Sequence, residues 1–166
     1  MILTRLSPLA ATLALCVLSA PSHAQAVRTE RNMSLELANQ IAAAGVAACA
    51  ANGYNVTTTV VDRAGTVRAV QRADNAGPHT VAASLGKAYT SASAKNATGA
   101  MLENVQKNPG AATLVDIPGF LVLGGGVPVK VGNEVIGAVG IGGAPGGHLD
   151  EQCALAALDK VKDLLK

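Results

Sequence analysis

Apolar residues recur every three or four positions in four stretches of the chain, a spacing typical of helices that bury one face. These stretches are residues 35–51, 80–95, 98–105 and 151–165. Ser34 is a suitable N-cap for the first helix and Asp150 for the last. In the second helix, the apolar side consists of Val81, Leu85, Ala88 and Ala92. The pattern therefore predicts four helices.

Five shorter stretches are rich in β-branched residues or alternate between apolar and polar positions, which predicts strands. They are residues 55–62, 66–72, 120–123, 127–131 and 134–141. Short turns join most neighbouring strands, so the sheet is expected to be mostly antiparallel. Helices before, between and after the strands can cover both faces of the sheet. The predicted fold class is therefore α/β, in the α+β sense, with three α/β/α layers around a five-stranded antiparallel sheet.

The first 24 residues have the pattern of a secretory signal peptide. Arg5 precedes an apolar run at residues 6–20, and Ser22 and Ala24 flank His23 in a small-x-small ending. A membrane anchor is the alternative, but the run is short for ~30 Å of hydrocarbon and no stop-transfer charges follow it directly. We therefore expect cleavage after Ala24 and a periplasmic or secreted product, which no longer binds the membrane after cleavage.

Two segments remain after this cleavage. Residues 25–33 are polar and are expected to be flexible, and residues 34–166 form one domain. A lipid-modified start at Cys16 is disfavoured, because Leu15 stands where a small residue is expected.

Charge and composition exclude several classes of function. The signal peptide removes Arg5 from the 13 basic residues and leaves all 11 acidic ones, so no electrostatic reason remains to bind nucleic acid. With no Trp, two Tyr and one Phe, the chain offers few aromatic rings for stacking. No G-x-S-x-G, H-E-x-x-H, Walker A or C-x-x-C sequence is present. Composition and motifs therefore lean away from an enzyme.

Cys49 and Cys153 remain after cleavage, and a pair of cysteines in an exported protein suggests a disulfide. Two small buried thiols among alanines are the alternative. If the first and last helices pack antiparallel, the end of one meets the start of the other. Gly45 and Ala157, one turn away from each cysteine, would then let the helices approach closely. A disulfide between these helices is our prediction.

Candidate binding residues gather around glycine clusters at 124–126 and 142–147, which bound one predicted hairpin at its open end. The clusters are expected to lie side by side and line one cleft, although close backbone packing explains them equally well. His79 is a candidate metal or haem-iron ligand, and His148 is a weaker one. Lys87 is a candidate partner for a carboxylate or a haem propionate. Asp62 and Asp74 flank the first hairpin, where a shared metal and turn chemistry are alternatives.

Six short motifs occur in order along the chain: VDRAG (61–65), RADNA (72–76), AASLGKAYTSA (82–92), GGVPV (125–129), VIGAVGIGG (135–143) and DEQCA (150–154). This series resembles the GlcG/HbpS-like, or haem-degrading-domain, family. The resemblance implies a profilin-like fold, homo-oligomers, haem as a cofactor or ligand, and a sensor kinase as a partner of some members. Other members accompany glycolate or diol metabolism without a defined activity. Asn75 and the 142–148 loop depart from the family pattern, so the ligand can differ.

From these observations we expect an exported protein that binds haem or another small ligand and assists haem breakdown or iron release. The alternatives are an accessory protein or enzyme acting on a small carboxylate metabolite, and an oligomeric sensor or adaptor module. His79 is the predicted metal ligand. The predicted ligand-binding residues are Asp74, His79, Lys87, Gly125, Gly126, Gly142 and Gly143.

Overall fold

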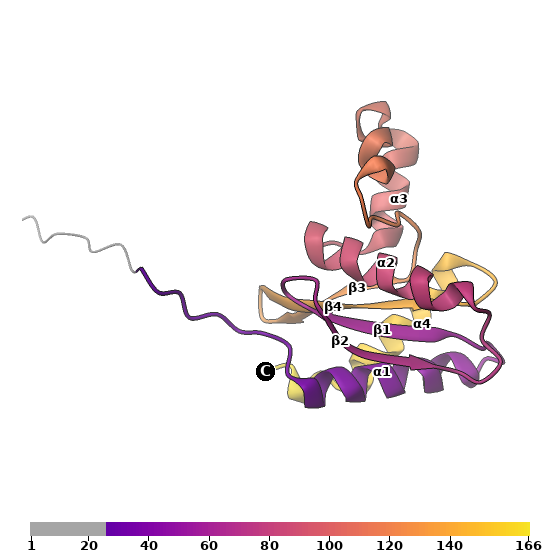
Figure 1. Cartoon of the computed structure of the whole chain (residues 1–166), viewed down its shortest axis with the longest axis horizontal. Helices are drawn as coiled ribbons and strands as arrows, with labels where there is room; N and C mark the ends of the chain where they lie inside the picture. Colours follow the sequence, from indigo (N-terminus) through magenta and orange to yellow (C-terminus); the bar gives the residue numbers. More distant parts are fainter. Residues whose placement is uncertain (1–25) are drawn as a thin grey trace, which may run out of the picture.

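The computed structural model of the chain describes residues 26–166, and the expected signal peptide lies outside the described residues. Its centre is one antiparallel sheet with the strand order β2-β1-β4-β3 (Figure 1). The strands are β1 (Thr57–Asp62), β2 (Val67–Arg72), β3 (Gly126–Val131) and β4 (Glu134–Gly142). All six residues of β1 are buried, because this strand is central and covered on both faces. The two hairpins therefore form as the turn sequences predict.

The prediction of a fifth strand at residues 120–123 is wrong. Gly119 before this segment and Gly125 after it both have positive φ, so the backbone turns at each end. The Leu121 N–H donates to the Thr90 side chain at 2.7 Å, and the Leu123 carbonyl accepts from the Thr98 hydroxyl at 2.7 Å. The segment thus satisfies these two backbone groups with side chains instead of a strand ladder. Among the described residues the sheet has four strands.

Within residues 26–166, four α-helices surround the sheet, and two short 3₁₀ helices follow α3 and α4. Their bounds are α1 (Leu35–Ala50), α2 (His79–Ala94), α3 (Thr98–Lys107), α4 (Gly147–Lys160), η1 (Pro109–Asp116) and η2 (Lys162–Leu164). Helices α1 and α4 pack side by side on one face of the sheet, and α2 covers the other (Figure 1). This arrangement confirms the three α/β/α layers. Helix α3 and η1 project away from the sheet beyond α2.

The two faces of the sheet are packed differently. The face under α1 and α4 holds the large apolar core, which includes Ile41, Val60, Val129, Val139 and Ile141. The apolar cluster under α2 consists of Val61, Ala88, Ala92 and Ala138. Hydrophobic burial therefore holds α1 and α4, whereas α2 needs further contacts.

Helix α1 begins as predicted, with the Ser34 hydroxyl accepting the N–H of Leu37 at 3.1 Å. Gly45, however, does not face the seam with α4. A Cβ at Gly45 would lie 2.6 Å from the Thr58 hydroxyl oxygen, so this glycine lets α1 approach the sheet. The expectation that Gly45 brings the two helices together is therefore wrong.

Helix α4 begins four residues earlier than the predicted start at residue 151. Gly146 is its N-cap, and Asp150 lies inside the first turn with its side chain buried. The Gly146-Gly147 pair resembles a loop in sequence, which hides the true start.

Before α1, Met33 is buried in the core and the Asn32 side chain accepts the N–H groups of Met33 and Arg63. Within residues 26–166 no helix has the length and apolar character needed to cross a membrane.

Candidate functional site

Helix α2 is attached to the sheet through its polar side chains. The hydroxyls of Thr57 and Thr80 lie 2.7 Å apart, and those of Thr59 and Ser84 also lie 2.7 Å apart. All four residues are buried, so the hydroxyls satisfy each other away from water. Gly126 and Gly140 face the helix backbone so closely that a Cβ on either would collide with a carbonyl oxygen of α2. These contacts set α2 at a short, defined distance from the sheet.

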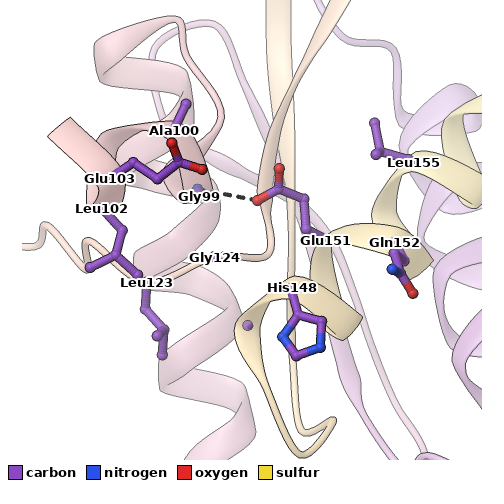
Figure 2. Close-up of a pocket in the computed structure, with 11 residues that line it drawn as sticks. Gly99, Ala100, Leu102, Glu103, Leu123, Gly124, His148, Glu151, Gln152 and Leu155 are labelled. Atoms are coloured by element: carbon purple, nitrogen blue, oxygen red, sulfur yellow. Dashed lines mark hydrogen bonds between the residues drawn. The ribbon is translucent and has the colours of Figure 1, made fainter.

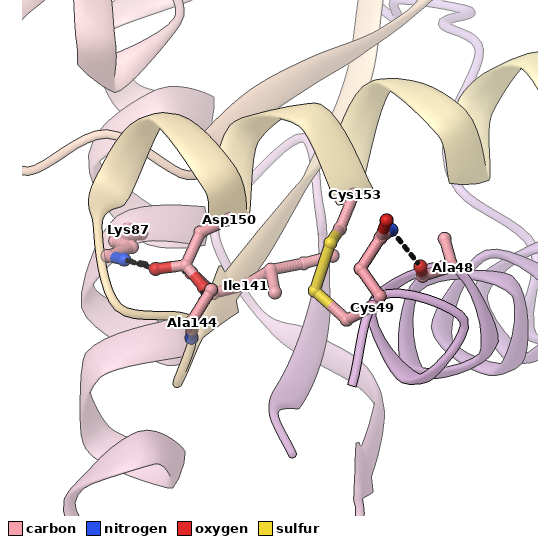
Figure 3. The surroundings of a disulfide bond; sticks show 8 residues. Ala48, Cys49, Lys87, Ile141, Ala144, Asp150 and Cys153 are labelled. Carbon is pink, nitrogen blue, oxygen red and sulfur yellow. Dashed lines mark hydrogen bonds and ion pairs between the residues drawn. A yellow bond between two sulfur atoms is a disulfide. The ribbon is translucent and has the colours of Figure 1, made fainter. Parts of the chain in front are cut away.

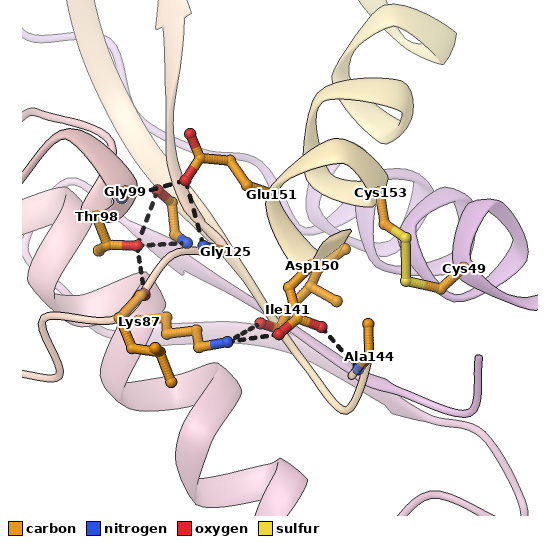
Figure 4. A network of polar contacts seen from close by, with 12 residues as sticks. Cys49, Lys87, Thr98, Gly99, Gly125, Ile141, Ala144, Asp150, Glu151 and Cys153 are labelled. Carbon is orange, nitrogen blue, oxygen red and sulfur yellow. Dashed lines mark hydrogen bonds and ion pairs between the residues drawn. A yellow bond between two sulfur atoms is a disulfide. The ribbon is translucent and has the colours of Figure 1, made fainter. Parts of the chain in front are cut away.

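A buried ion pair extends this attachment to α4 (Figure 4). The Lys87 ammonium donates to the Asp150 carboxylate at 2.7 Å and to the Ile141 carbonyl at 2.9 Å, and Lys87 is only 1% exposed. The other Asp150 oxygen accepts the Ala144 N–H at 2.9 Å. Burial raises the pKa of the Asp150 carboxyl, against the opposing effects of Lys87 and the Ala144 N–H. The pair ties α2, β4 and the 143–146 loop to the first turn of α4.

Two further side chains connect the start of α3 to the glycine-rich segment before β3 (Figure 4). The Thr98 hydroxyl accepts the Gly126 N–H at 2.8 Å. The Glu151 carboxylate accepts the N–H groups of Gly99 at 3.1 Å and Gly125 at 3.4 Å. A carboxylate is well placed at the first turn of α3, because a helix N-terminus carries partial positive charge. Glu151 therefore links α4, α3 and the segment before β3.

The predicted disulfide between Cys49 and Cys153 is present in the structure (Figure 3). The Cα atoms of the two residues are 5.3 Å apart, and both side chains are buried. The bond joins the last turn of α1 to the first half of α4, as the antiparallel arrangement of these helices predicts. Asp150, Glu151 and Cys153 thus fasten the start of α4 to three different neighbours.

The elements joined by these contacts line a pocket of about 510 Å³, which we call the glycine-loop pocket (Figure 2). Its lining residues come from α3, the segment before β3 and the start of α4: Gly99, Ala100, Leu102, Glu103, Leu123, Gly124, Gly147, His148, Glu151, Gln152 and Leu155. Three leucines give it apolar surface, and His148 supplies an imidazole. The volume lies within the range of small-molecule sites.

The two glycine clusters do lie side by side, as predicted. A Cβ at Gly124 would be 3.0 Å from the carbonyl carbon of Gly147, and both residues line the pocket. The predicted binding residues Gly125, Gly126, Gly142 and Gly143 have a different environment. A Cβ on any of them would meet atoms of α2, of Asp150 or of residues 55 and 56 within about 3 Å. The structure thus favours close backbone packing for these four glycines.

The other predicted site residues do not meet in one place. His79 is the exposed first residue of α2, and Asp74 is exposed in the turn after β2. Lys87 lies in the interior, paired with Asp150 of the same chain. None of the three lines the glycine-loop pocket. His148, which the sequence alone ranked below His79, does line it.

Asp62 and Asp74 cannot share a metal ion. Asp62 ends β1 while Asp74 follows the far end of β2, so the length of a six-residue strand, about 17 Å, separates them. The Asp62 carboxylate accepts the N–H groups of Ala64 and Thr66, which is turn chemistry. Within residues 26–166, no three His, Cys, Asp or Glu side chains are grouped to hold a metal.

Sequence reasoning missed the contribution of α3. Gly99, Leu102 and Glu103 line the pocket, but their sequence is an ordinary short amphipathic helix with no binding motif. Only the paired glycine clusters and the weaker candidate His148 pointed to this region. Glu151 and Gln152 stood in a family-like motif, yet nothing in that motif shows that they face a cavity.

Comparisons with known proteins agree with this fold. Residues 33–159 match the model of a family described as "Haem degrading protein HbpS-like". Protein GlcG of Escherichia coli (strain K12) is 36% identical over 115 residues, which is 69% of this chain and 84% of GlcG. The crystal structure of a double mutant of Streptomyces reticuli HbpS superposes with a TM-score of 0.77 at 34% identity, covering 93% of this chain and 99% of that one.

The chain therefore belongs to the HbpS-like family of haem-degrading proteins, which confirms the resemblance seen in its motifs. A crystal structure of PduOC in complex with haem is also similar, with a TM-score of 0.69, covering 77% of this chain and 94% of that one. At 24% identity that similarity shows the shared fold alone.

Proposed function

We propose that this chain is an exported HbpS-like protein that binds haem, or a similar small ligand, in the glycine-loop pocket. The observation that carries the proposal is the position of His148. It is one of two histidines that remain after the expected cleavage, and it lines a pocket of about 510 Å³ together with three leucines. A neutral imidazole is a common haem-iron ligand, and leucine side chains provide apolar contact for a porphyrin.

Some residues of the pocket suit haem, and others would determine which way its propionates point. Leu102, Leu123 and Leu155 suit the macrocycle, and His148 can hold iron. Glu103 and Glu151 would repel the propionates, so these groups should extend toward solvent. The same two carboxylates disfavour a small anionic metabolite, which weakens the alternative of an accessory protein or enzyme for a small carboxylate.

Lys87 then acts as a positioning residue. Because its ammonium is held by Asp150 and Ile141, it supports the first turn of α4, on which His148 lies, without touching the ligand. His79, which the sequence predicted as the metal ligand from its position before the second helix, is the alternative iron ligand. Oxidative breakdown of a porphyrin, if it occurs, is chemistry that bound haem supplies, while this chain provides access and iron ligation.

Titration of the mature chain, residues 25–166, with haemin tests the proposal, with the Soret band as the readout. His148→Ala should weaken affinity at least about tenfold and shift the band, whereas His79→Ala, which removes the alternative ligand, should change neither. The opposite result would move the iron site to the start of α2. If neither variant differs from the parent, or if no Soret band develops, haem ligation by histidine is wrong.

Export is the second part of the proposal, and it rests on the pattern of residues 1–24. Mass spectrometry of the product recovered outside the cytoplasm should find Gln25 as the first residue. A lipid-bearing start at Cys16, or a chain that retains Met1, would contradict cleavage after Ala24. The homo-oligomer and the sensor-kinase partner that the family resemblance implies also remain proposals.

A further inference from the structure

Another pocket lies at the turn end of the β3–β4 hairpin, and three of its side chains are cationic. It has a volume of about 500 Å³, and we call it the basic pocket. The residues that line it are Arg63, Lys95, Lys130, Asn133, Glu134 and Val135. One carboxylate stands against three cations, so the pocket carries an excess of positive charge at neutral pH. The glycine-loop pocket lies at the opposite, open end of the same hairpin.

The fold brings these three cations together from distant parts of the chain. Arg63 follows β1, Lys95 is the C-cap of α2, and Lys130 lies near the end of β3. The strand pairing places the β1–β2 and β3–β4 turns at the same end of the sheet (Figure 1). Helix α2 ends over this part of the sheet, because Ala92 in its last turn belongs to the same apolar cluster as Val61, one residue before the end of β1. Like charges repel each other, so their convergence favours an anion between them.

Arg63 is held in one orientation by its neighbours. Its Nη1 donates to the Glu134 carboxylate at 2.6 Å and to the Arg31 carbonyl at 2.8 Å, and its side chain is 19% exposed. The hydrogen bond from Arg63 lowers the pKa of Glu134, so this carboxyl stays charged and neutralises much of the guanidinium charge. Lys95 and Lys130, by contrast, form no ion pair within residues 26–166. The two lysines therefore supply the charge that is available to a ligand.

The backbone at Lys95 is a second sign that this side chain has a use. Among the described residues, Lys95 is the only one other than glycine with a positive φ, at 54°. Helices that end in this left-handed conformation usually have Gly or Asn there, because a Cβ is unfavourable. A lysine at such a position has two explanations: it compensates the partial negative charge at the end of α2, or it binds a ligand. The helix end does not explain Lys130, which lies in a strand.

A phosphate group fits this arrangement best. Its tetrahedral oxygens can accept from donors on several sides, and a phosphate monoester carries about two negative charges at neutral pH. Asn133 can add a neutral amide donor, and the volume is that of a small-molecule site. Glu134 opposes an anion, but its charge is taken up by Arg63. We propose that the basic pocket binds a phosphate monoester or free phosphate through Lys95 and Lys130.

Calorimetric titration of the mature chain, without haemin and at low ionic strength, tests this inference. Inorganic phosphate and glycerol phosphate are the probes, and succinate, a dicarboxylate, tests the class of anion. The phosphates should occupy one saturable site per chain and bind more tightly than succinate. Tighter binding of glycerol phosphate would identify a monoester as the ligand, and tighter binding of inorganic phosphate would identify the free ion. Added sodium chloride should weaken binding, because salt screens exposed charges.

Two variants test the lysines separately. Lys130→Gln removes one charge but keeps most of the side-chain length, and it should weaken phosphate binding about tenfold, as expected for one charge-assisted hydrogen bond. Lys95→Gly should weaken binding by a similar factor while leaving Tm unchanged or higher, because glycine adopts the positive φ without a Cβ. Lys160→Gln is the matched control, since Lys160 is also exposed but lies in α4, outside the basic pocket. The control should bind phosphate as the parent does.

Several results would overturn the inference. A parent chain without saturable phosphate binding at millimolar concentration would show that these side chains are only solvated. Unchanged affinity in Lys95→Gly or in Lys130→Gln would contradict binding by both lysines, and an equal loss in Lys160→Gln would reduce the effect to the net charge of the chain. Succinate binding as tight as phosphate binding would contradict the class of anion. The glycine-loop pocket takes no part in this site, so failure here is distinct from a failure of haemin binding.

Discussion

The two faces of the sheet solve the same packing problem in different ways. On the α1/α4 face, contacts are mainly between apolar side chains such as Ile41, Val60 and Val139. On the α2 face, paired hydroxyls, a buried ion pair and close glycine contacts hold the helix. The apolar face gains most from the amount of surface buried, which is not directional. The polar face depends on geometry, because each buried group needs its partner.

This difference explains where the candidate sites lie. The α1/α4 face uses its large apolar residues for the core, and the groove between these two helices is lined mostly by alanines. The α2 face is held by polar contacts and keeps Val81, Leu85 and Tyr89 on its outer side. Its ion pair and the disulfide also fasten α4, which lines the glycine-loop pocket. The predictions below test whether the two faces respond as differently as their chemistry requires.

The largest effect is expected from Lys87→Met. This change leaves the Asp150 carboxylate buried without its cation, so the free energy of unfolding should fall by about 3–5 kcal/mol at pH 7. Urea unfolding followed by circular dichroism measures the loss. The loss should shrink on acidification, because protonation of Asp150 removes the uncompensated charge. A loss under about 1 kcal/mol would contradict the importance of the pair.

A somewhat smaller effect is expected on the apolar face when the disulfide is removed. Cys49 and Cys153 are 104 residues apart in sequence, so their bond restricts the unfolded chain strongly. Cys49→Ser with Cys153→Ser should lower the free energy of unfolding by about 2–4 kcal/mol. If the oxidised parent and the double variant have the same free energy of unfolding in urea, the disulfide does not stabilise the fold. Two free thiols per unfolded, unreduced parent chain would show that the bond does not form.

The paired hydroxyls of Thr59 and Ser84 should contribute less. Ser84→Ala leaves the buried Thr59 hydroxyl with one partner fewer and should cost about 1–2 kcal/mol. The double change Thr59→Val with Ser84→Ala removes both polar groups and should recover part of that loss. A double-mutant cycle in urea gives the coupling energy. Strictly additive losses would mean that this contact does not distinguish the two faces.

The smallest effect is a pH dependence that belongs to Asp150. Burial raises its pKa above the ordinary value of 3.8, so the folded chain holds this proton to higher pH than the unfolded chain. The resulting stabilisation is fully present below pH 3.8 and is lost as the pH rises through the raised pKa. Asp150→Asn should remove this slope from the free energy of unfolding, although it also lowers stability overall. Parallel pH profiles of parent and variant would contradict the raised pKa.

Glu134 supplies the contrasting case at the surface. The Arg63 guanidinium donates a hydrogen bond to this carboxylate and lowers its pKa below the ordinary value of 4.5. Its contribution to stability is therefore present above pH 4.5 and is lost as the pH falls through the lowered pKa. The difference between parent and Asp150→Asn isolates the buried group, because Glu134 is the same in both chains.

The local sequence determined the number of α-helices in the described residues and both hairpins, and it suggested the pairing of the cysteines. These features depend on short-range signals, such as the Ser34 cap, β-branched strands and glycine turns, and on the expected antiparallel contact of α1 and α4. The ordered motifs also determined the family, which the comparisons confirm. In each case the information lies within one element or in the order of elements.

Only the tertiary structure decided the number of strands, the direction in which α2 faces and the residues of the pocket. Residues 120–123 look like a strand, but Thr90 and Thr98, from other elements, bind their backbone groups. The buried side of α2 is polar because β1 and the first turn of α4 supply partners for its hydroxyls and for Lys87. Such partners are distant in sequence, so periodicity alone assigns Val81 and Leu85 to the wrong environment. Which side of α2 is buried therefore depends on the hydrogen-bond and ion-pair partners that β1 and α4 supply in the folded chain.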